Sequence, residues 1–298
     1  MIEEKLHEVE AKIATSMKKR SADCQDDVLL IAVTKNHDIH AMRQAIDAGV
    51  TDIGENRIQE AKEKYETLDR KVTWHLIGHL QTNKAKQAVK IFDLIHSVDS
   101  LHLAEALNKA AAGINKVQKV LVQVNLAHED SKSGIYEDGL EELLHQVDEM
   151  DNLQLMGLMC IAPNYENVED CRPLFANMKK IYDHIKEISW QKANIKYLSM
   201  GMTHDYTIAV EEGANVVRVG TGIFGKPLKS VIQSIVFTKT GRICMLKIRL
   251  QGTLKDIQWF RRILEKHKEL DVLEVSDAYA NKGTSKYFRV YVEVEEKE

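Results

Sequence analysis

The stretch VLLIAVTKNHDIHAMRQAIDAGVTDIGEN (28–56) contains a strand, a helix and a second strand in succession. Its two ends are short apolar runs of the kind that form buried parallel strands. The segment between them repeats apolar side chains at helical spacing and closes on Gly49, a common residue at helix ends. The stretch therefore predicts one βα repeat around a parallel sheet. The apolar positions of its helix are Ile39, Met42, Ala45 and Ile46.

The same alternation of apolar runs and helical segments continues to residue 220. About eight βα repeats within roughly 200 residues suit a closed barrel better than an open doubly wound sheet. We therefore expect an α/β fold, a (β/α)8 TIM barrel, over residues 1–226. The candidate strands are 28–35, 51–56, 73–79, 93–99, 119–125, 153–161, 195–201 and 215–220.

Beyond Gly225 the pattern changes. Two apolar runs joined by a turn are followed by Thr253, which can cap an amphipathic helix, and then by two further runs. This order predicts a small α+β domain of ββαββ type over residues 229–298, with a domain boundary near 226–230. The predicted strands are 231–237, 242–250, 272–276 and 286–295, and the predicted helix runs from Leu254 to Leu264.

Composition excludes several classes of protein. A formal net charge of −4 provides no overall attraction to nucleic acid, and no segment approaches the roughly 18 apolar residues of a membrane span. The start, MIEEKLHEVEAKI, is acidic and helical, unlike a secretory signal or a transit peptide. The four cysteines have neither metal-site nor disulfide-framework spacing. We expect a cytoplasmic protein with no nucleic-acid, membrane or metal partner.

Polar residues close most of the predicted strands, at the end of a barrel where active sites form. Lys35 ends the first strand, where the barrel wall could desolvate its amine and leave it nucleophilic toward an aldehyde. The alternative is a solvated lysine at the start of a loop. Arg218 can only donate hydrogen bonds, so against a pyridine nitrogen it would leave that nitrogen unprotonated and the ring a poor electron sink. The alternative for Arg218 is a buried ion pair with Glu55 or Asp99.

The segment VRVGTGIFG (217–225) contains a literal GxGxxG directly after a strand. A dinucleotide site would also need a helix opening on the glycines and an acidic residue about 20 positions on, and neither is present. A glycine-rich turn after the eighth strand of a barrel favours a phosphate nest instead, with glycines needed only for turns as the alternative. His75 and His79 have the spacing of a helical metal pair, but they fall in a strand and its loop, which argues against a metal site.

Read together, the strand-end motifs resemble those of the pyridoxal-phosphate homeostasis protein family, over residues 1 to about 225. The resemblance implies a barrel like the N-terminal domain of fold-III alanine racemase. It also implies a role in vitamin B6 homeostasis, in which pyridoxal 5′-phosphate (PLP) is buffered or delivered without a firmly established catalytic activity. The matching motifs are AVTK (32–35), IGENRIQEAKEK (53–64), WHLIGHLQTNK (74–84), HSVDS (96–100), QVN…E..KSG (123–134), GLM.I (157–161), LSMGMTHDY (198–206) and VRVGTGIFG (217–225).

The resemblance also implies a set of cofactor contacts. Lys35 would hold PLP as an internal aldimine, a Schiff base, and Arg218 would face the pyridine nitrogen. The phosphate would be held by Ser199, Gly201, Gly220 and Thr221, and the ring would be lined by Asn56 and Met159. The chain departs from the usual family pattern at Ile53, Arg57 and Thr203, where Phe, Tyr and Ser are usual. The domain at 229–298 is outside the family chain, so the resemblance says nothing about its role.

Three functions are compatible with these features. The first is a PLP carrier or regulator without catalytic activity of its own, serving PLP-dependent apoenzymes and existing as a monomer or weak homodimer. The second is a fold-III amino-acid racemase or decarboxylase, which needs a second acid/base that the short C-terminal domain is too small to supply. The third is an interaction protein in which the C-terminal domain docks a partner and the barrel senses the cofactor.

Overall fold

The computed structural model describes residues 1–21, 24–127, 129, 133–225, 232–237, 245–266, 270–280 and 288–296. The chain divides into two compact units, Met1–Gly225 and Lys226–Glu298. Each unit has its own hydrophobic core.

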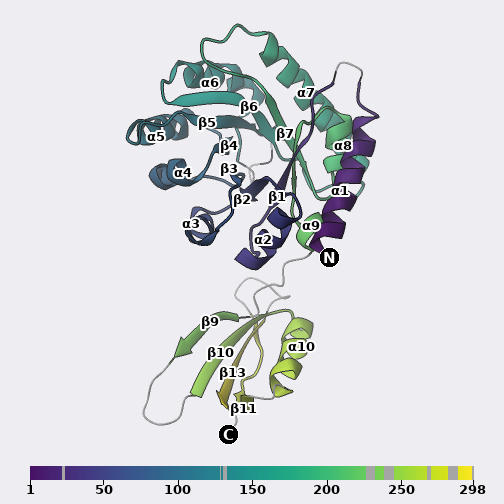
Figure 1. Cartoon of the computed structure of the whole chain (residues 1–298), viewed down its shortest axis with the longest axis vertical. Helices are drawn as coiled ribbons and strands as arrows, with labels where there is room; N and C mark the ends of the chain where they lie inside the picture. The colour runs from purple at the N-terminus through teal and green to yellow at the C-terminus, as the bar shows by residue number, and fades with distance from the viewer. Residues whose placement is uncertain are drawn as a thin grey trace. The chain divides into compact units, whose positions relative to one another are not determined.

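The first unit is a closed barrel of eight parallel strands in sequence order, with the last strand pairing with the first (Figure 1). The predicted TIM barrel is thus confirmed, and every observed strand overlaps a predicted one. The strands are β1 (Leu29–Val33), β2 (Asp52–Glu55), β3 (Thr73–Leu76), β4 (Leu94–Val98), β5 (Gln118–Val124), β6 (Leu153–Cys160), β7 (Tyr197–Met202) and β8 (Val216–Val219).

Helices surround the barrel, as Figure 1 shows, and local capping sets where several of them begin. The Asp38 carboxylate accepts a hydrogen bond from the Ala41 amide at 2.8 Å and starts the second helix, while Ser100 caps the fifth. The helices are α1 (Ile2–Met17), α2 (Ile39–Asp47), α3 (Ile58–Thr67), α4 (Ala85–Ile91), α5 (Leu101–Ala112), α6 (Glu137–Glu149), α7 (Arg172–Glu187), α8 (Tyr206–Glu211) and α9 (Thr221–Phe224), with short 3-10 turns η1 (Thr82–Lys84) and η2 (Val168–Cys171).

The barrel has an outer core between strands and helices and a smaller inner core. The outer core buries alternate strand residues such as Ala32 and Ile53 against the helices. A separate cluster of Leu94, Leu121, Met156 and Met159 packs on the other side of the strands, inside the barrel. Among the described residues, no helix has the length and apolar character needed to cross a bilayer.

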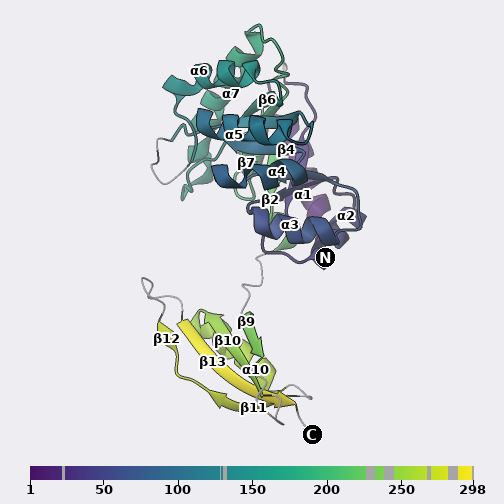
Figure 2. The same cartoon turned by 90° about the vertical axis from the view of Figure 1, so that its left-hand side faces the viewer.

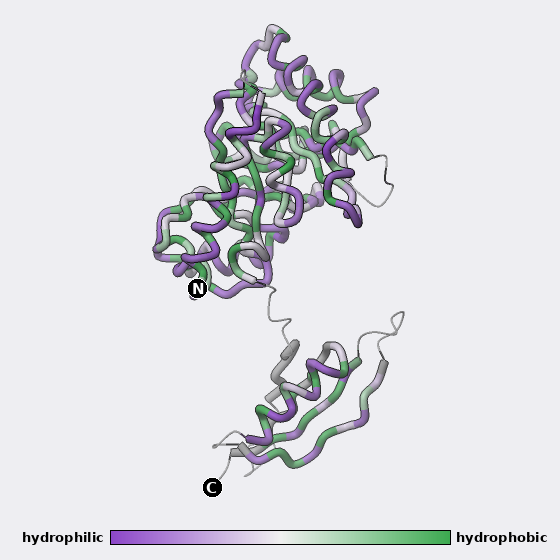
Figure 3. The backbone as a smooth tube through the Cα atoms, turned by 90° about the vertical axis from the view of Figure 1, so that its right-hand side faces the viewer, coloured by the Kyte–Doolittle hydropathy of each residue, from purple (hydrophilic) through white to green (hydrophobic). Residues whose placement is uncertain are grey.

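The second unit is an antiparallel sheet in the order β11-β13-β10-β9, with a short β12 beside β13 (Figure 2). The predicted ββαββ order is confirmed, although the turn predicted between the first two strands lies outside the described residues. Hydrophilic and hydrophobic residues alternate along its helix (Figure 3). The elements are β9 (Ile232–Phe237), β10 (Met245–Gly252), α10 (Leu254–Glu265), β11 (Leu270–Val275), β12 (Tyr279–Ala280) and β13 (Phe288–Glu296).

A small core holds this unit together. Val290, Val292 and Val294 share one face of β13 and pack with Ile257 and Leu264 of α10. The Thr253 hydroxyl accepts a hydrogen bond from the Asp256 amide at 3.3 Å and caps α10, as expected. The helix therefore covers one face of the sheet, which gives this unit a core of its own.

Candidate functional site

The site is built at the C-terminal ends of the barrel strands. β1 ends at Val33, two residues earlier than predicted, so Lys35 lies in the turn that follows. The turn is closed by a hydrogen bond from the His37 amide to the Thr34 carbonyl, and Asn36 adopts a left-handed conformation with φ of 61°. The Lys35 side chain is exposed. The barrel wall does not bury the amine, so the expectation of a desolvated lysine is wrong for this structure.

The residues on both sides of Lys35 are held by the buried ammonium group of Lys64, one directly and one through Glu60. Lys64 of α3 donates from Nζ to the Thr34 carbonyl, to Glu55 Oε1 and to Glu60 Oε1, each at 2.7 Å. Glu60 Oε1 in turn accepts the Asn36 amide at 2.6 Å. Burial raises the pKa of Glu55, although the neighbouring Lys64 opposes this shift. The Lys64 cluster therefore fixes the backbone from which Lys35 projects.

The glycine-rich turn after β8 lies beside the Lys35 turn. The His37 ring stacks on Phe224 of α9 with 4.7 Å between centroids, and a Cβ on Gly220 would lie 3.3 Å from Val33. The amides of Gly220 and Gly222 both point to the Thr203 hydroxyl, at 3.2 and 3.4 Å. Both N–H groups are thus taken up by a neutral hydroxyl oxygen, and a phosphate nest at this turn stays a prediction.

The other residues expected at the phosphate have different surroundings. Thr221 is exposed at the start of α9. Gly201 has φ of 92°, and a Cβ there would lie 2.6 Å from Ala209 Cβ, so only glycine allows β7 to end against α8. The Ser199 hydroxyl points into the barrel interior, where it contacts Arg218 and a histidine. A phosphate role for these three residues stays a prediction. Sequence reasoning gave too little weight to Thr203, noted only because its hydroxyl replaces the usual Ser.

Arg218 lies inside the barrel and is 3% exposed. Its Nη1 donates to Ser199 Oγ at 2.6 Å, and its Nη2 donates to the Cys160 carbonyl at 2.9 Å. The alternative ion pairs are wrong in the described part of the chain. Glu55 is bonded to Lys64, and Asp99 lies 3.6 Å from His79. Arg218 is thus held by two neutral acceptors, and its guanidinium keeps further N–H groups to donate.

A row of polar side chains that sequence reasoning missed continues from Arg218 across the barrel interior. Ser199 Oγ lies 3.0 Å from His96 Nδ1, His96 Nε2 lies 3.0 Å from His75 Nδ1, and His75 Nε2 lies 2.8 Å from Asp52 Oδ1. All five residues are buried. The signal in the sequence was two histidines on the inward face of neighbouring predicted strands.

His75 and His79, considered above as a metal pair, do not come together. His75 is 2% exposed inside the barrel, whereas the His79 side chain is 56% exposed and contacts Ser133 and Asp99. The two rings have different surroundings because one belongs to a strand and the other to the loop after it.

Asn56 and Met159 are the residues expected around the cofactor ring. Asn56 follows β2, and its Oδ1 is buried without a hydrogen-bond partner among the described residues. Gly78 packs so closely against Asn56 that a Cβ there would lie 2.4 Å from its carbonyl oxygen. Met159 is fully buried in the inner core of the barrel. Asn56 therefore has an acceptor still to satisfy, whereas Met159 packs as core.

The alanine racemase N-terminal domain matches residues 10–227. The pyridoxal phosphate homeostasis protein of Aquifex aeolicus is 40% identical over 198 residues, which cover 66% of this chain and 86% of the relative. The chain belongs to the pyridoxal phosphate homeostasis protein family. The Escherichia coli K12 member is 36% identical over 231 residues, covering 74% of this chain and 94% of that protein.

A solved structure agrees with this assignment. PipY of Synechococcus elongatus PCC7942, with PLP bound, is 38% identical and has a TM-score of 0.66. The match covers 76% of this chain and all of that one. The family match ends at residue 227, so residues 228–298 lie outside it.

Proposed function

We propose that this chain binds PLP at the mouth of its barrel through Lys35 and serves as an intracellular carrier or regulator of that cofactor. One observation carries the proposal: the Lys35 turn, the amide nest of Gly220 and Gly222, and Arg218 occupy adjoining strand ends. Membership of the pyridoxal phosphate homeostasis family and the PLP bound by PipY support it.

The residues at the mouth fit a phosphorylated pyridine aldehyde. The Gly220 and Gly222 amides converge on the Thr203 hydroxyl, which accepts from both and keeps its own proton to donate to a phosphate. Asn56, beside the same strand ends, has a buried oxygen with no hydrogen-bond partner in the described part of the chain. The Lys35 amine is exposed and free to meet an aldehyde from solution.

PLP supplies an aldehyde that condenses with amines and a pyridine ring that can withdraw electrons when its nitrogen is protonated. Arg218 is always a donor and keeps its proton, so it would leave that nitrogen unprotonated. Its hydrogen bonds to Ser199 and to the Cys160 carbonyl hold it in this role. A site that binds the cofactor while weakening its electron withdrawal suits storage and delivery better than amino-acid chemistry.

A fold-III racemase or decarboxylase is the second candidate, and the site favours it less. Two-sided proton transfer needs an acid/base opposite the lysine. Beside the Lys35 turn, the carboxylates of Glu55 and Glu60 are bonded to Lys64, and the His37 ring is stacked on Phe224. We propose PLP-dependent apoenzymes as recipients of the cofactor, and a monomer or weak homodimer as the working state.

Lys35→Ala tests the proposal. The purified chain mixed with PLP should show a visible absorption band, and borohydride should fix the cofactor to the peptide that contains Lys35. Lys35→Ala should lose the band and keep its circular dichroism, because an exposed turn residue contributes little to packing. The control is Lys62→Ala, an exposed lysine of α3, which should keep the band. A band that persists in Lys35→Ala would place the attachment elsewhere.

A further inference from the structure

A buried row of five side chains runs from Arg218 to the amino-terminal end of β2. Its members are Arg218, Ser199, His96, His75 and Asp52, joined by distances of 2.6, 3.0, 3.0 and 2.8 Å. They come from β8, β7, β4, β3 and β2, so the row crosses the barrel interior. Five polar or charged side chains in a barrel core are costly unless each hydrogen bond is made.

The chemistry of the two ends gives this row one direction. Arg218 carries only donors, and an ionised carboxylate at Asp52 carries only acceptors. Burial alone would raise the pKa of Asp52, but hydrogen bonds from His75 and Thr51 outweigh it and lower the pKa, which keeps the carboxylate ionised. His75 must therefore donate from Nε2 to Asp52.

Each link then follows from the one before it. Burial, and then the neighbouring His75 and Arg218, lower the pKa of His96 well below its ordinary value, so this ring is neutral. If His75 carries a single proton, on the Nε2 that donates to Asp52, its Nδ1 accepts from His96 Nε2, and His96 then accepts at Nδ1. Ser199 then donates its hydroxyl proton to His96 and offers a lone pair to Arg218 Nη1.

We propose that Asp52, His75, His96 and Ser199 are positioning residues for Arg218, forming a one-directional hydrogen-bond chain that holds its guanidinium as a donor toward the cofactor. The part of this inference that concerns the cofactor rests on the proposed function. The hydrogen-bond chain supplies the buried Arg218 with an oriented acceptor, while the carboxyl group of Asp205 attracts its charge. Its two Nη atoms are satisfied by oriented neutral acceptors, Ser199 Oγ and the Cys160 carbonyl.

The histidine tautomers of the free protein test the direction of the chain. In ¹⁵N-labelled full-length protein near neutral pH, the ring nitrogens of His75 and His96 should both report neutral rings with the proton on Nε2. Exposed His102 serves as the internal reference, because its ring makes no hydrogen bond to the described residues. A proton on His96 Nδ1, or a doubly protonated His75, would overturn the chain, because Ser199 would then accept from both sides.

Two serine variants test whether the chain positions Arg218. Ser199→Ala removes the acceptor of Arg218, whereas Ser97→Ala removes an equally buried hydroxyl of β4 that has no partner among the described residues. Ser199→Ala should raise the Kd for PLP roughly ten-fold and shift the absorption band of the bound cofactor, since a hydrogen bond to a charged group is lost. Ser97→Ala should change neither.

Two variants of His96 test whether a conservative replacement preserves PLP binding. Glutamine at position 96 can accept from Ser199 through its carbonyl oxygen and donate to His75 through its amide, in the same direction as the native ring. His96→Gln should therefore keep the Kd within about three-fold of the native value, whereas His96→Leu should raise it roughly ten-fold. An equal change in Kd in the two variants would mean that the hydrogen-bond chain has only a structural role, and it would overturn the proposal.

The outcomes separate the two proposals. If borohydride still fixes PLP to Lys35 and Ser199→Ala matches Ser97→Ala in Kd and spectrum, the positioning role is wrong and the proposed function stands. If the native chain takes up no PLP, the proposed function is wrong. The histidine tautomers then decide by themselves whether the one-directional hydrogen-bond chain exists.

Discussion

Lys64 is buried in an ion pair, although lysine side chains usually lie at the surface. Its side chain is 9% exposed, and it contacts Glu55, which is fully buried. Removing one partner of a buried ion pair leaves the other charge without compensation, which costs far more than losing a surface pair. The same ammonium group holds the Thr34 carbonyl and, through Glu60, the Asn36 amide. Stability and the placement of Lys35 therefore depend on one side chain.

We expect Lys64→Met to lower the free energy of unfolding by about 3 kcal/mol, because Glu55 would remain buried without its cation. The matched control is Lys62→Met on the same helix, where a 52% exposed lysine lies 3.7 Å from Glu66, and a change within about 0.5 kcal/mol is expected. Urea unfolding of both variants measures the difference. Similar losses in the two variants would show that the Lys64 cluster is no more than surface charge.

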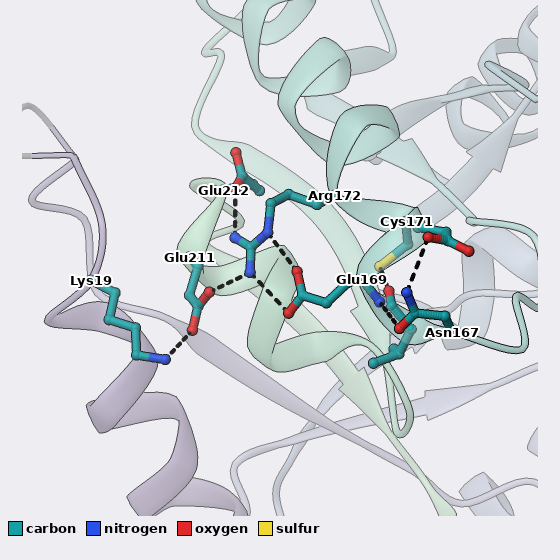
Figure 4. A network of polar contacts seen from close by, with 9 residues as sticks. Lys19, Asn167, Glu169, Cys171, Arg172, Glu211 and Glu212 are labelled. Carbon is teal, nitrogen blue, oxygen red and sulfur yellow. Dashed lines mark hydrogen bonds and ion pairs between the residues drawn. The ribbon is translucent and has the colours of Figure 1, made fainter.

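At the scale of elements, one arginine joins three of them, α7, η2 and α8 (Figure 4). Arg172, the first residue of α7, contacts Glu169 of η2 at 2.8 Å, Glu211 of α8 at 2.8 Å, and Glu212 at 2.7 Å. Lys19, just after α1, contacts Glu211 at 2.8 Å. The network fastens α7 and α8 to the end of α1, which individual surface pairs would do weakly.

This network should make stability depend on pH. The hydrogen bond from Arg172 lowers the pKa of Glu169, and hydrogen bonds from Lys19 and Arg172 lower that of Glu211. A carboxyl group with a lowered pKa stabilises the fold above its unfolded pKa, and this contribution is lost as pH falls through the folded pKa. We expect Arg172→Leu to cost on the order of 1 kcal/mol at neutral pH and progressively less as the pH falls below the ordinary pKa of a glutamate.

Thermal melts from neutral to acid pH test this expectation. Arg43→Leu is the control, because Arg43 has the same 35% exposure as Arg172 but, among the residues described, pairs only with the exposed Asp69. Its loss should be a few tenths of a kcal/mol. A pH-independent loss in Arg172→Leu would mean that the arginine acts through packing and not through its carboxylate partners.

At the scale of the whole molecule, every residue proposed for PLP belongs to the first unit, Met1–Gly225. That unit has its own core and closes its barrel without residues from the second. A fragment of residues 1–225 should therefore fold cooperatively and bind PLP with a Kd within about two-fold of the full chain. Absorbance titration of both proteins measures this. A loss of affinity beyond about ten-fold would show that residues 226–298 complete the site.

Much of the fold was predictable because it depends on local patterns. Eight apolar runs separated by amphipathic helices are enough to select a closed parallel barrel, since each strand must be buried on both faces. The order of strands and helix in the second unit followed from Thr253 as a cap and from the alternation of Val290, Val292 and Val294. Lys35, Arg218 and the glycines after β8 were identified by their place at strand ends.

Only the tertiary structure showed which side chains of different strands lie within hydrogen-bonding distance. The sequence by itself determined the barrel, the family and the candidate lysine, because motifs and periodicity are properties of neighbouring residues. Only the closed barrel brings His75, His96 and Ser199 into one hydrogen-bonded row, since their strands meet across its interior. The tertiary structure also showed that β1 ends at Val33, which leaves Lys35 exposed in a turn. It showed as well that Lys64 of α3 reaches this turn. Hydrogen bonds need partners within about 3 Å, and the order of residues along a chain does not specify that separation.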